Sequence, residues 1–156
     1  MFDRLESAII PFAPEQFVSC GEEFLRRLGV TRQKAAYLIH LAELIVKGQL
    51  ILPRLSRMTD EDARQALMNV KGIGAWSADV YLLMAMCRAD IWPAGDLALA
   101  AAAKELFQLR ARPSQIELEA LAEKWRPLRA VAARMMWQYY LATRAKPKFA
   151  SRAISK

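Results

Sequence analysis

The stretch NVKGIGAW, residues Asn69–Trp76, decides the fold because it places two of the chain's six glycines on either side of a single isoleucine. Amphipathic, helix-favouring sequence lies on both sides of it. A tight link between two helices needs residues that tolerate a positive φ, and we expect Gly72 and Gly74 to provide them. The stretch therefore predicts a hairpin of two helices, with the second helix beginning near Ala75.

The start of that second helix leaves backbone N–H groups unpaired, and the helix dipole adds positive potential there. Glycine lets an anion approach the backbone closely, and Lys71 adds a positive charge nearby. These features are typical of a phosphate-binding site. A plain helix–helix connection has the same Gly-x-Gly spacing, so the glycines alone leave both interpretations open.

The rest of the chain predicts an all-α fold without internal repeats or strands. Helix-capping residues and apolar stripes set the expected boundaries, with Thr31 and Thr59 as N-caps and Gly29 as a C-cap. We expect one domain over residues 1–143 and a basic, disordered tail over residues 144–156. The expected helices cover residues 14–28, 31–48, 59–70, 75–87, 96–107 and 114–125, with a last helix after Pro127.

The composition suits a single helical domain, since 54% of the 156 residues are hydrophobic and glycine and proline are scarce. The longest apolar run, Val80–Cys87, falls far short of the roughly 20 residues of a membrane span. The N-terminus has no signal-peptide pattern, so we expect the protein in the cytoplasm, at the nucleoid if it is bacterial, with no membrane partner. Cys20 and Cys87 are expected to be reduced thiols.

The net charge of +7 permits nucleic-acid binding without establishing it. Five of the cations lie in the tail, and without them the net charge falls to +2. The alternative interpretation is therefore a solvated tail with no partner. The five cations are Arg144, Lys146, Lys148, Arg152 and Lys156.

Four stretches over about residues 12–143 together resemble the helix-hairpin-helix DNA glycosylases of base excision repair, in their alkylated-base (3-methyladenine) branch. The hairpin of the family is similar to NVKGIGAWSADVYLLMAM (69–86), and its catalytic loop is similar to DIWPAGDLAL (90–99). The last helix of the branch is similar to EKWRPLRAVAARMMWQYY (123–140), and the helix before the hairpin is similar to GVTRQKAAYLIHLAELI (29–45).

The resemblance implies that the backbone around Gly72, Gly74 and Ser77 grips a DNA phosphate, often through a bound monovalent cation, with Lys71 beside it. It implies no other cofactor. The only histidine, His40, is expected to be structural, and the chain offers no zinc or iron–sulfur ligand set.

Asp96 follows the second glycine by 22 residues and begins a predicted helix. Its spacing alone indicates an ordinary N-cap. The resemblance implies that it is also the catalytic carboxylate. An ionised carboxylate there would stabilise the positive charge that develops on the sugar as the glycosidic bond breaks, and would orient or deprotonate water.

Trp76 and Trp137 match two pocket tryptophans of the alkylated-base branch, where aromatic walls receive the flipped base. Relatives that also cut the DNA backbone carry a lysine at the position of Trp76, and tryptophan cannot form a Schiff base. The family's pocket tyrosine position is Val80 here, and the adjacent Tyr81 is our candidate for that role. The alternative for both tryptophans is ordinary core packing.

The sequence thus predicts a monofunctional DNA glycosylase that hydrolyses the N-glycosidic bond of alkylated purines in double-stranded DNA, acting as a monomer. The resemblance also implies that further helices and a β-rich domain precede the point matching Met1, so we expect an N-terminally truncated member. The rival hypotheses are a non-catalytic helix-hairpin-helix DNA-binding module with an incomplete base pocket, and a fragment that folds only with a partner.

Overall fold

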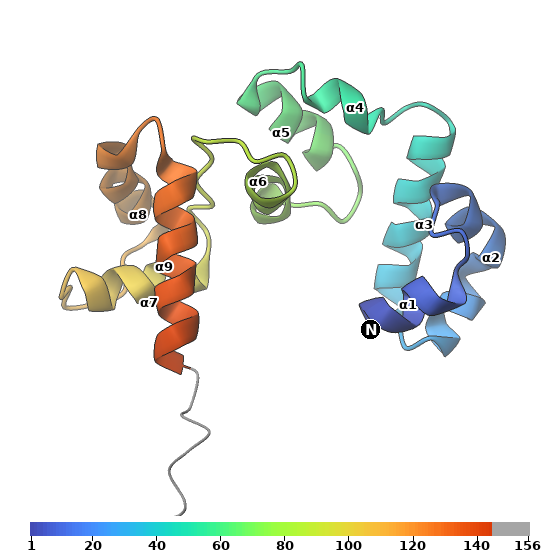
Figure 1. Cartoon of the computed structure of the whole chain (residues 1–156), viewed down its shortest axis with the longest axis horizontal. Helices are drawn as coiled ribbons and strands as arrows, with labels where there is room; N and C mark the ends of the chain where they lie inside the picture. Colours follow the sequence, from blue (N-terminus) through green and yellow to red (C-terminus); the bar gives the residue numbers. More distant parts are fainter. Residues whose placement is uncertain (145–156) are drawn as a thin grey trace, which may run out of the picture. The chain divides into compact units, whose positions relative to one another are not determined.

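A computed structural model describes residues 1–144, and every regular element within them is a helix (Figure 1). The all-α prediction is confirmed. Of the predicted tail, only Arg144 is described, and it ends the last helix; residues 145–156 lie outside the described residues. The elements are α1 (Phe2–Ala8), α2 (Pro14–Arg27), α3 (Arg32–Val46), α4 (Leu52–Leu55), α5 (Asp60–Met68), α6 (Ala75–Met84), α7 (Leu97–Leu106), α8 (Gln115–Ala122), the short 3-10 helix η1 (Glu123–Trp125) and α9 (Arg129–Arg144).

Side-chain caps begin the helices where the sequence predicts them. The Thr31 hydroxyl oxygen accepts a hydrogen bond from the Lys34 N–H, and Thr59 caps α5 in the same way at 3.1 Å. Ser114 forms a full capping box, because its hydroxyl accepts from the Glu117 N–H while the Glu117 carboxylate accepts from the Ser114 N–H at 2.8 Å. Such caps use backbone donors that the helix itself cannot pair.

Three features depart from the predicted helix pattern. Helices α1 and α4 were not predicted; they have seven and four residues and no side-chain cap, so they carry little local signal. The helix expected over residues 14–28 is interrupted at Gly21, which has a φ of 73°. A single glycine inside an apolar stripe is compatible with either a continuous or a kinked helix, so the pattern could not decide.

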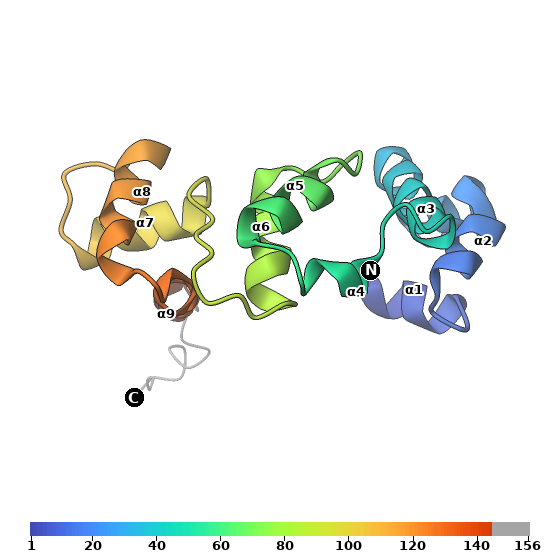
Figure 2. The ribbon, with the colours of Figure 1, turned by 90° about the horizontal axis from the view of Figure 1, so that it is seen from above.

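The chain forms two compact units that divide between Ala78 and Asp79, and each is considered by itself. In the first unit, α2 lies beside α3 (Figures 1 and 2) and α1 closes the same apolar core. The buried side chains of this core are Leu5, Ile9, Phe17, Leu25, Val30, Ala35 and Ala42.

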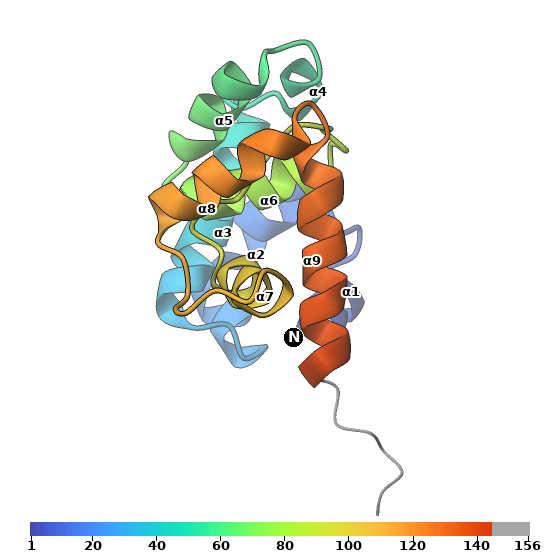
Figure 3. The same ribbon diagram turned by 90° about the vertical axis from the view of Figure 1, so that its left-hand side faces the viewer.

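In the second unit α7 packs against α9 (Figure 3). Helix α7 buries a run of four alanines, residues 100–103, whose small side chains suit close helix packing. In the same unit Trp92, Phe107 and Trp125 form an aromatic cluster, in which the Trp125 ring centroid lies 5.5 Å from that of Trp92 and 6.0 Å from that of Phe107. Among the described residues, no helix is long and apolar enough to cross a membrane.

Candidate functional site

The predicted hairpin joins α5 to α6. The Ile73 N–H donates to the Val70 carbonyl at 3.0 Å, and Val70 is buried, so the turn is fixed to the interior of its unit. The carbonyl of Gly74 accepts from the Ala78 N–H at 3.0 Å. Gly74 therefore stands at the N-cap of α6.

The two glycines of the hairpin differ in backbone conformation. Gly72 has a φ of 96°, in the left-handed region that favours glycine. Gly74 does not have a positive φ, so the expectation that both glycines supply one is wrong. Of the two hairpin glycines, only Gly72 therefore uses the conformational freedom that is special to glycine. A Cβ added to Gly74 would meet nothing within 4 Å.

Gly72 has a second constraint, which comes from Tyr37 on α3. A Cβ on Gly72 would come within 2.9 Å of the Tyr37 Cε2 and closer still to two other ring carbons. The Tyr37 hydroxyl accepts a hydrogen bond from the Gln33 Nε2 at 2.9 Å, which fixes the ring. The Tyr37 ring thus packs against the turn at Gly72. The sequence did not predict this contact, because 35 residues separate Tyr37 from Gly72.

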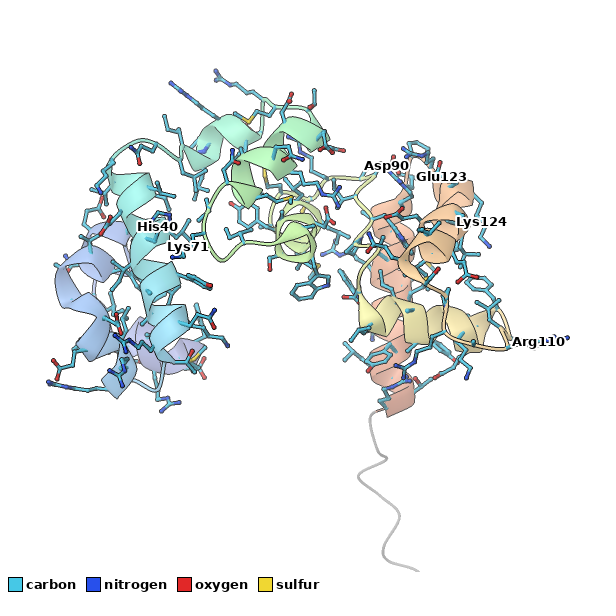
Figure 4. The ribbon with its side chains drawn as sticks, turned by 180° about the vertical axis from the view of Figure 1, so that it is seen from behind. His40, Lys71, Asp90, Arg110, Glu123 and Lys124 are labelled. Atoms are coloured by element: carbon cyan, nitrogen blue, oxygen red, sulfur yellow. The ribbon has the colours of Figure 1, made fainter. Side chains whose placement is uncertain are left out.

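The remaining residues predicted to bind the DNA backbone lie around the same turn. Lys71 is exposed and lies on the loop between α5 and α6 (Figure 4). Ser77 is half-buried in the first turn of α6, a helix of ten residues whose N-terminal end favours anions. The turn therefore combines an exposed cation, a glycine backbone and a helix start, and the phosphate contact itself stays a prediction.

Asp96 is the N-cap of α7, as predicted. Its Oδ1 accepts hydrogen bonds from the N–H groups of Ala98 and Leu99, each at 2.8 Å, and its own N–H donates to the Pro93 carbonyl at 3.0 Å. Only 7% of the residue is exposed, which makes it one of two buried acidic residues in the described chain. A carboxylate held this firmly and shielded from water has the local setting that electrostatic catalysis requires.

The candidate pocket residues occupy α6 and α9. Trp76 lies in the first turn of α6 and is 50% exposed, so its ring is not an ordinary core residue in this structure. Tyr81 and Trp137 are half-buried, Tyr81 on α6 and Trp137 on α9. Five residues along a helix correspond to a rotation of about 140°, so Trp76 and Tyr81 point in different directions. Their roles in a base pocket stay predictions.

An ionic cluster anchors the segment that leads to Asp96, although the sequence analysis did not single it out. The Asp90 carboxylate accepts hydrogen bonds from Arg129 and Arg126, and Arg126 also pairs with Glu123 at 2.7 Å (Figure 4). The hydrogen bonds from Arg129 lower the pKa of Asp90 below its ordinary value. Asp90 therefore stays ionised in the folded unit further into acid than in an unfolded chain.

This lowered pKa predicts how stability depends on pH. The Asp90 cluster contributes fully above the unfolded pKa of about 3.9, and the contribution is lost as the pH falls through the lowered pKa of the folded state. We expect Asp90→Asn to lower the free energy of unfolding at neutral pH by about 1–3 kcal/mol and to flatten its decline in acid. Urea unfolding between neutral pH and about pH 3 measures both effects. An identical pH profile for both proteins would contradict the prediction.

Comparisons with known proteins bear on the family of the chain. The family model for the HhH-GPD superfamily base excision DNA repair protein matches residues 1–127. YfjP of Bacillus subtilis (strain 168) is 31% identical over 125 residues, which are 80% of this chain and 44% of that protein. The alkylbase DNA glycosidase-like protein mag2 of Schizosaccharomyces pombe is 30% identical over 126 residues, 80% of this chain and 59% of that protein. The chain thus spans about half the length of these two relatives.

Solved structures share the fold. The 3-methyladenine DNA glycosylase Mag1 of Schizosaccharomyces pombe, in complex with abasic DNA, has a TM-score of 0.80 and 26% identity over 88% of this chain and 68% of that chain. The DNA-3-methyladenine glycosidase of Bacillus halodurans has the same score and identity over 92% of this chain and 68% of that chain. These matches confirm the resemblance in the sequence. The chain belongs to the HhH-GPD superfamily of base excision DNA repair proteins.

Proposed function

We propose that this chain is a monofunctional DNA glycosylase that hydrolyses the N-glycosidic bond of alkylated purines in double-stranded DNA. The observation that carries the proposal is the buried carboxylate of Asp96, held by two backbone N–H groups at the start of α7 in a member of this superfamily. The names of its relatives, among them 3-methyladenine DNA glycosylases, support the choice of alkylated bases.

The proposed chemistry needs only water and the carboxylate. The bond between the purine nitrogen and the sugar C1′ breaks, and the electron pair leaves with the base. An alkylated purine is already cationic, so it departs as a neutral molecule without a proton from a general acid. Asp96 stabilises the positive charge on the sugar while a water oxygen bonds to C1′, and the proton lost by that water passes to the carboxylate or to solvent.

In this proposal the other predicted site residues bind the DNA backbone and select the damaged base. The Gly72–Gly74 turn, with Lys71 and Ser77, holds a phosphate next to the damaged nucleotide, directly or through a monovalent cation. Trp76 and Trp137 receive the flipped base, and an indole facing a cationic purine gains about 0.5–2 kcal/mol of cation–π attraction. No redox cofactor takes part, and the protein acts as a monomer on DNA in the cytoplasm or nucleoid.

The test is release of free methylated purines from alkylated duplex DNA by the purified chain. We expect base release without strand cleavage, because tryptophan at position 76 provides no amine for a Schiff base. Strand breaks should appear only after alkali treatment of the abasic product. DNA binding that weakens steeply with salt, without any base release, would instead support the non-catalytic binding module.

A further inference from the structure

The segment that carries Asp96 is held at both of its ends. Residues 90–96 form no helix or strand, and residues 91–94 between the two ends are buried. The Asp96 end is capped onto α7 by two hydrogen bonds. The position of the carboxylate therefore also depends on what holds the other end, at Asp90.

Arg129, the first residue of α9, holds that end through a fork of hydrogen bonds. Its Nε donates to Asp90 Oδ1 at 2.8 Å, and its Nη2 donates to Asp90 Oδ2 at 3.0 Å and to the Asp90 backbone carbonyl at 2.8 Å. The next residue, Ala130, donates its N–H to the Ala89 carbonyl at 3.0 Å. Side chain and backbone are thus both fixed to the start of α9.

The fork is a sheltered contact rather than a surface ion pair. The Arg129 and Asp90 side chains are 17% and 21% exposed, whereas the side chain of Arg126, the other arginine on Asp90, is 51% exposed. A planar guanidinium that binds a carboxylate through two nitrogens fixes orientation as well as distance. Arg129 therefore constrains where the segment runs, beyond adding stability.

We propose that Arg129 is a positioning residue that sets the place of Asp96 for the reaction. The inference rests on the proposed function of Asp96. Arg129 stands eight residues before Trp137 on α9, so one helix carries both the anchor of the catalytic segment and a predicted wall of the base pocket. Misplacing a reacting group by about 1 Å costs on the order of 100-fold in rate, so a loosened anchor reduces catalysis more than binding.

The test compares Arg129→Gln with the wild-type chain in single-turnover base release and in DNA binding. We expect the rate constant at saturating protein to fall about 10–100-fold while the dissociation constant for DNA changes little. Arg129→Lys keeps the charge but cannot form the fork, so its rate should lie in between. Urea unfolding of each variant establishes that it is folded under assay conditions.

A matched control is Arg144→Gln, which removes a different ion pair of the same helix. Arg144 pairs with Glu105 at 2.9 Å, and this ion pair links α9 to α7 and includes no residue of the 90–96 segment. Its rate constant should remain at the wild-type value. Equal falls in the rate constant for Arg144→Gln and Arg129→Gln would overturn the proposal, because a loss of stability alone would then explain the slower base release of both variants.

Amide hydrogen exchange separates this inference from the proposed function. In Arg129→Gln the amide hydrogens of residues 91–96, other than Pro93, which has none, should exchange faster, and those inside α8 should not. If the wild-type chain releases no base, the proposed function fails, yet faster exchange would still support the positioning of Asp96 by Arg129. Unchanged exchange, or a wild-type rate constant in a folded Arg129→Gln, would overturn the inference. Asp90→Asn should slow base release as Arg129→Gln does. The Asp90→Asn/Arg129→Gln double variant should release base no more slowly than either single variant.

Discussion

Asp96→Asn is expected to slow base release by about 10²–10⁴-fold, the usual contribution of a single acid–base or charge-stabilising group. Asparagine keeps the shape of the side chain but carries no negative charge to stabilise a cationic sugar. Single-turnover release of methylated purines from alkylated duplex DNA measures the effect. DNA binding should be retained, because the substitution leaves the hairpin turn unchanged.

The choice of asparagine separates chemistry from folding. The Asp96 Oδ1 accepts from the N–H groups of Ala98 and Leu99, and an amide oxygen can accept the same two bonds. Asparagine and aspartate are about equally good N-caps, so the free energy of unfolding should hardly change. A variant that is folded, binds DNA and releases base at the wild-type rate would exclude Asp96 as the catalytic group.

Ser114→Ala is the matched control for loss of a cap. It removes the capping box at the start of α8, in the same unit as Asp96, and should cost about 0.5–2 kcal/mol of stability. The rate constant of the folded protein should not change. A fall in rate similar to that of Asp96→Asn would mean that instability of the unit, rather than a lost carboxylate, explains the effect.

The sequence predicted the longer helices well because their boundaries are local signals. Thr31, Thr59 and Ser114 act within three residues of their partners, and the apolar stripes repeat within one helix. The hairpin at residues 69–76 and the N-cap at Asp96 are also set by residues close together in the sequence. Helices α1 and α4 could not be predicted in this way, since they are short and their starts carry no capping side chain.

The contacts that hold the candidate site in place are not local, and sequence reasoning missed them for that reason. Tyr37 and Gly72 are 35 residues apart, and Asp90 and Arg129 are separated by 39. Periodicity and capping rules describe neighbours within about four residues, so no pattern in one sequence pairs these positions. The residues predicted to do chemistry come from motifs and their roles stay predictions, whereas the contacts of Tyr37 and Arg129 could be seen only in the fold.

Gly72→Ala is expected to be strongly destabilising, for two additive reasons. A non-glycine residue in the left-handed conformation costs about 1–2 kcal/mol. The new methyl group must also displace the Tyr37 ring, and overpacking of this kind costs about 1–3 kcal/mol. Urea unfolding should show a loss of several kcal/mol, and fluorescence anisotropy with labelled duplex DNA should show weaker binding.

Gly74→Ala is the matched comparison two residues away. Its Cβ meets nothing within 4 Å and its φ is not positive, so stability should stay close to the wild-type value. If the backbone of the turn approaches a DNA phosphate, the added methyl group should still weaken DNA binding. Unchanged binding in this stable variant would contradict close approach of a phosphate at Gly74.

The double variant Tyr37→Ala/Gly72→Ala separates the two sources of lost stability in Gly72→Ala. One is the clash of the new methyl group with the Tyr37 ring, and the other is the left-handed backbone at position 72. Removing the ring clears the space that the methyl group needs, so adding Tyr37→Ala to Gly72→Ala should recover part of the lost stability. Tyr37→Ala alone should destabilise the turn, because Gly72 then loses its support. Costs that simply add would show that the ring does not constrain the turn, since residues in contact couple by about 0.5–3 kcal/mol. Coupling of this size would show that the Tyr37 ring, in addition to the positive φ, disfavours a side chain at position 72.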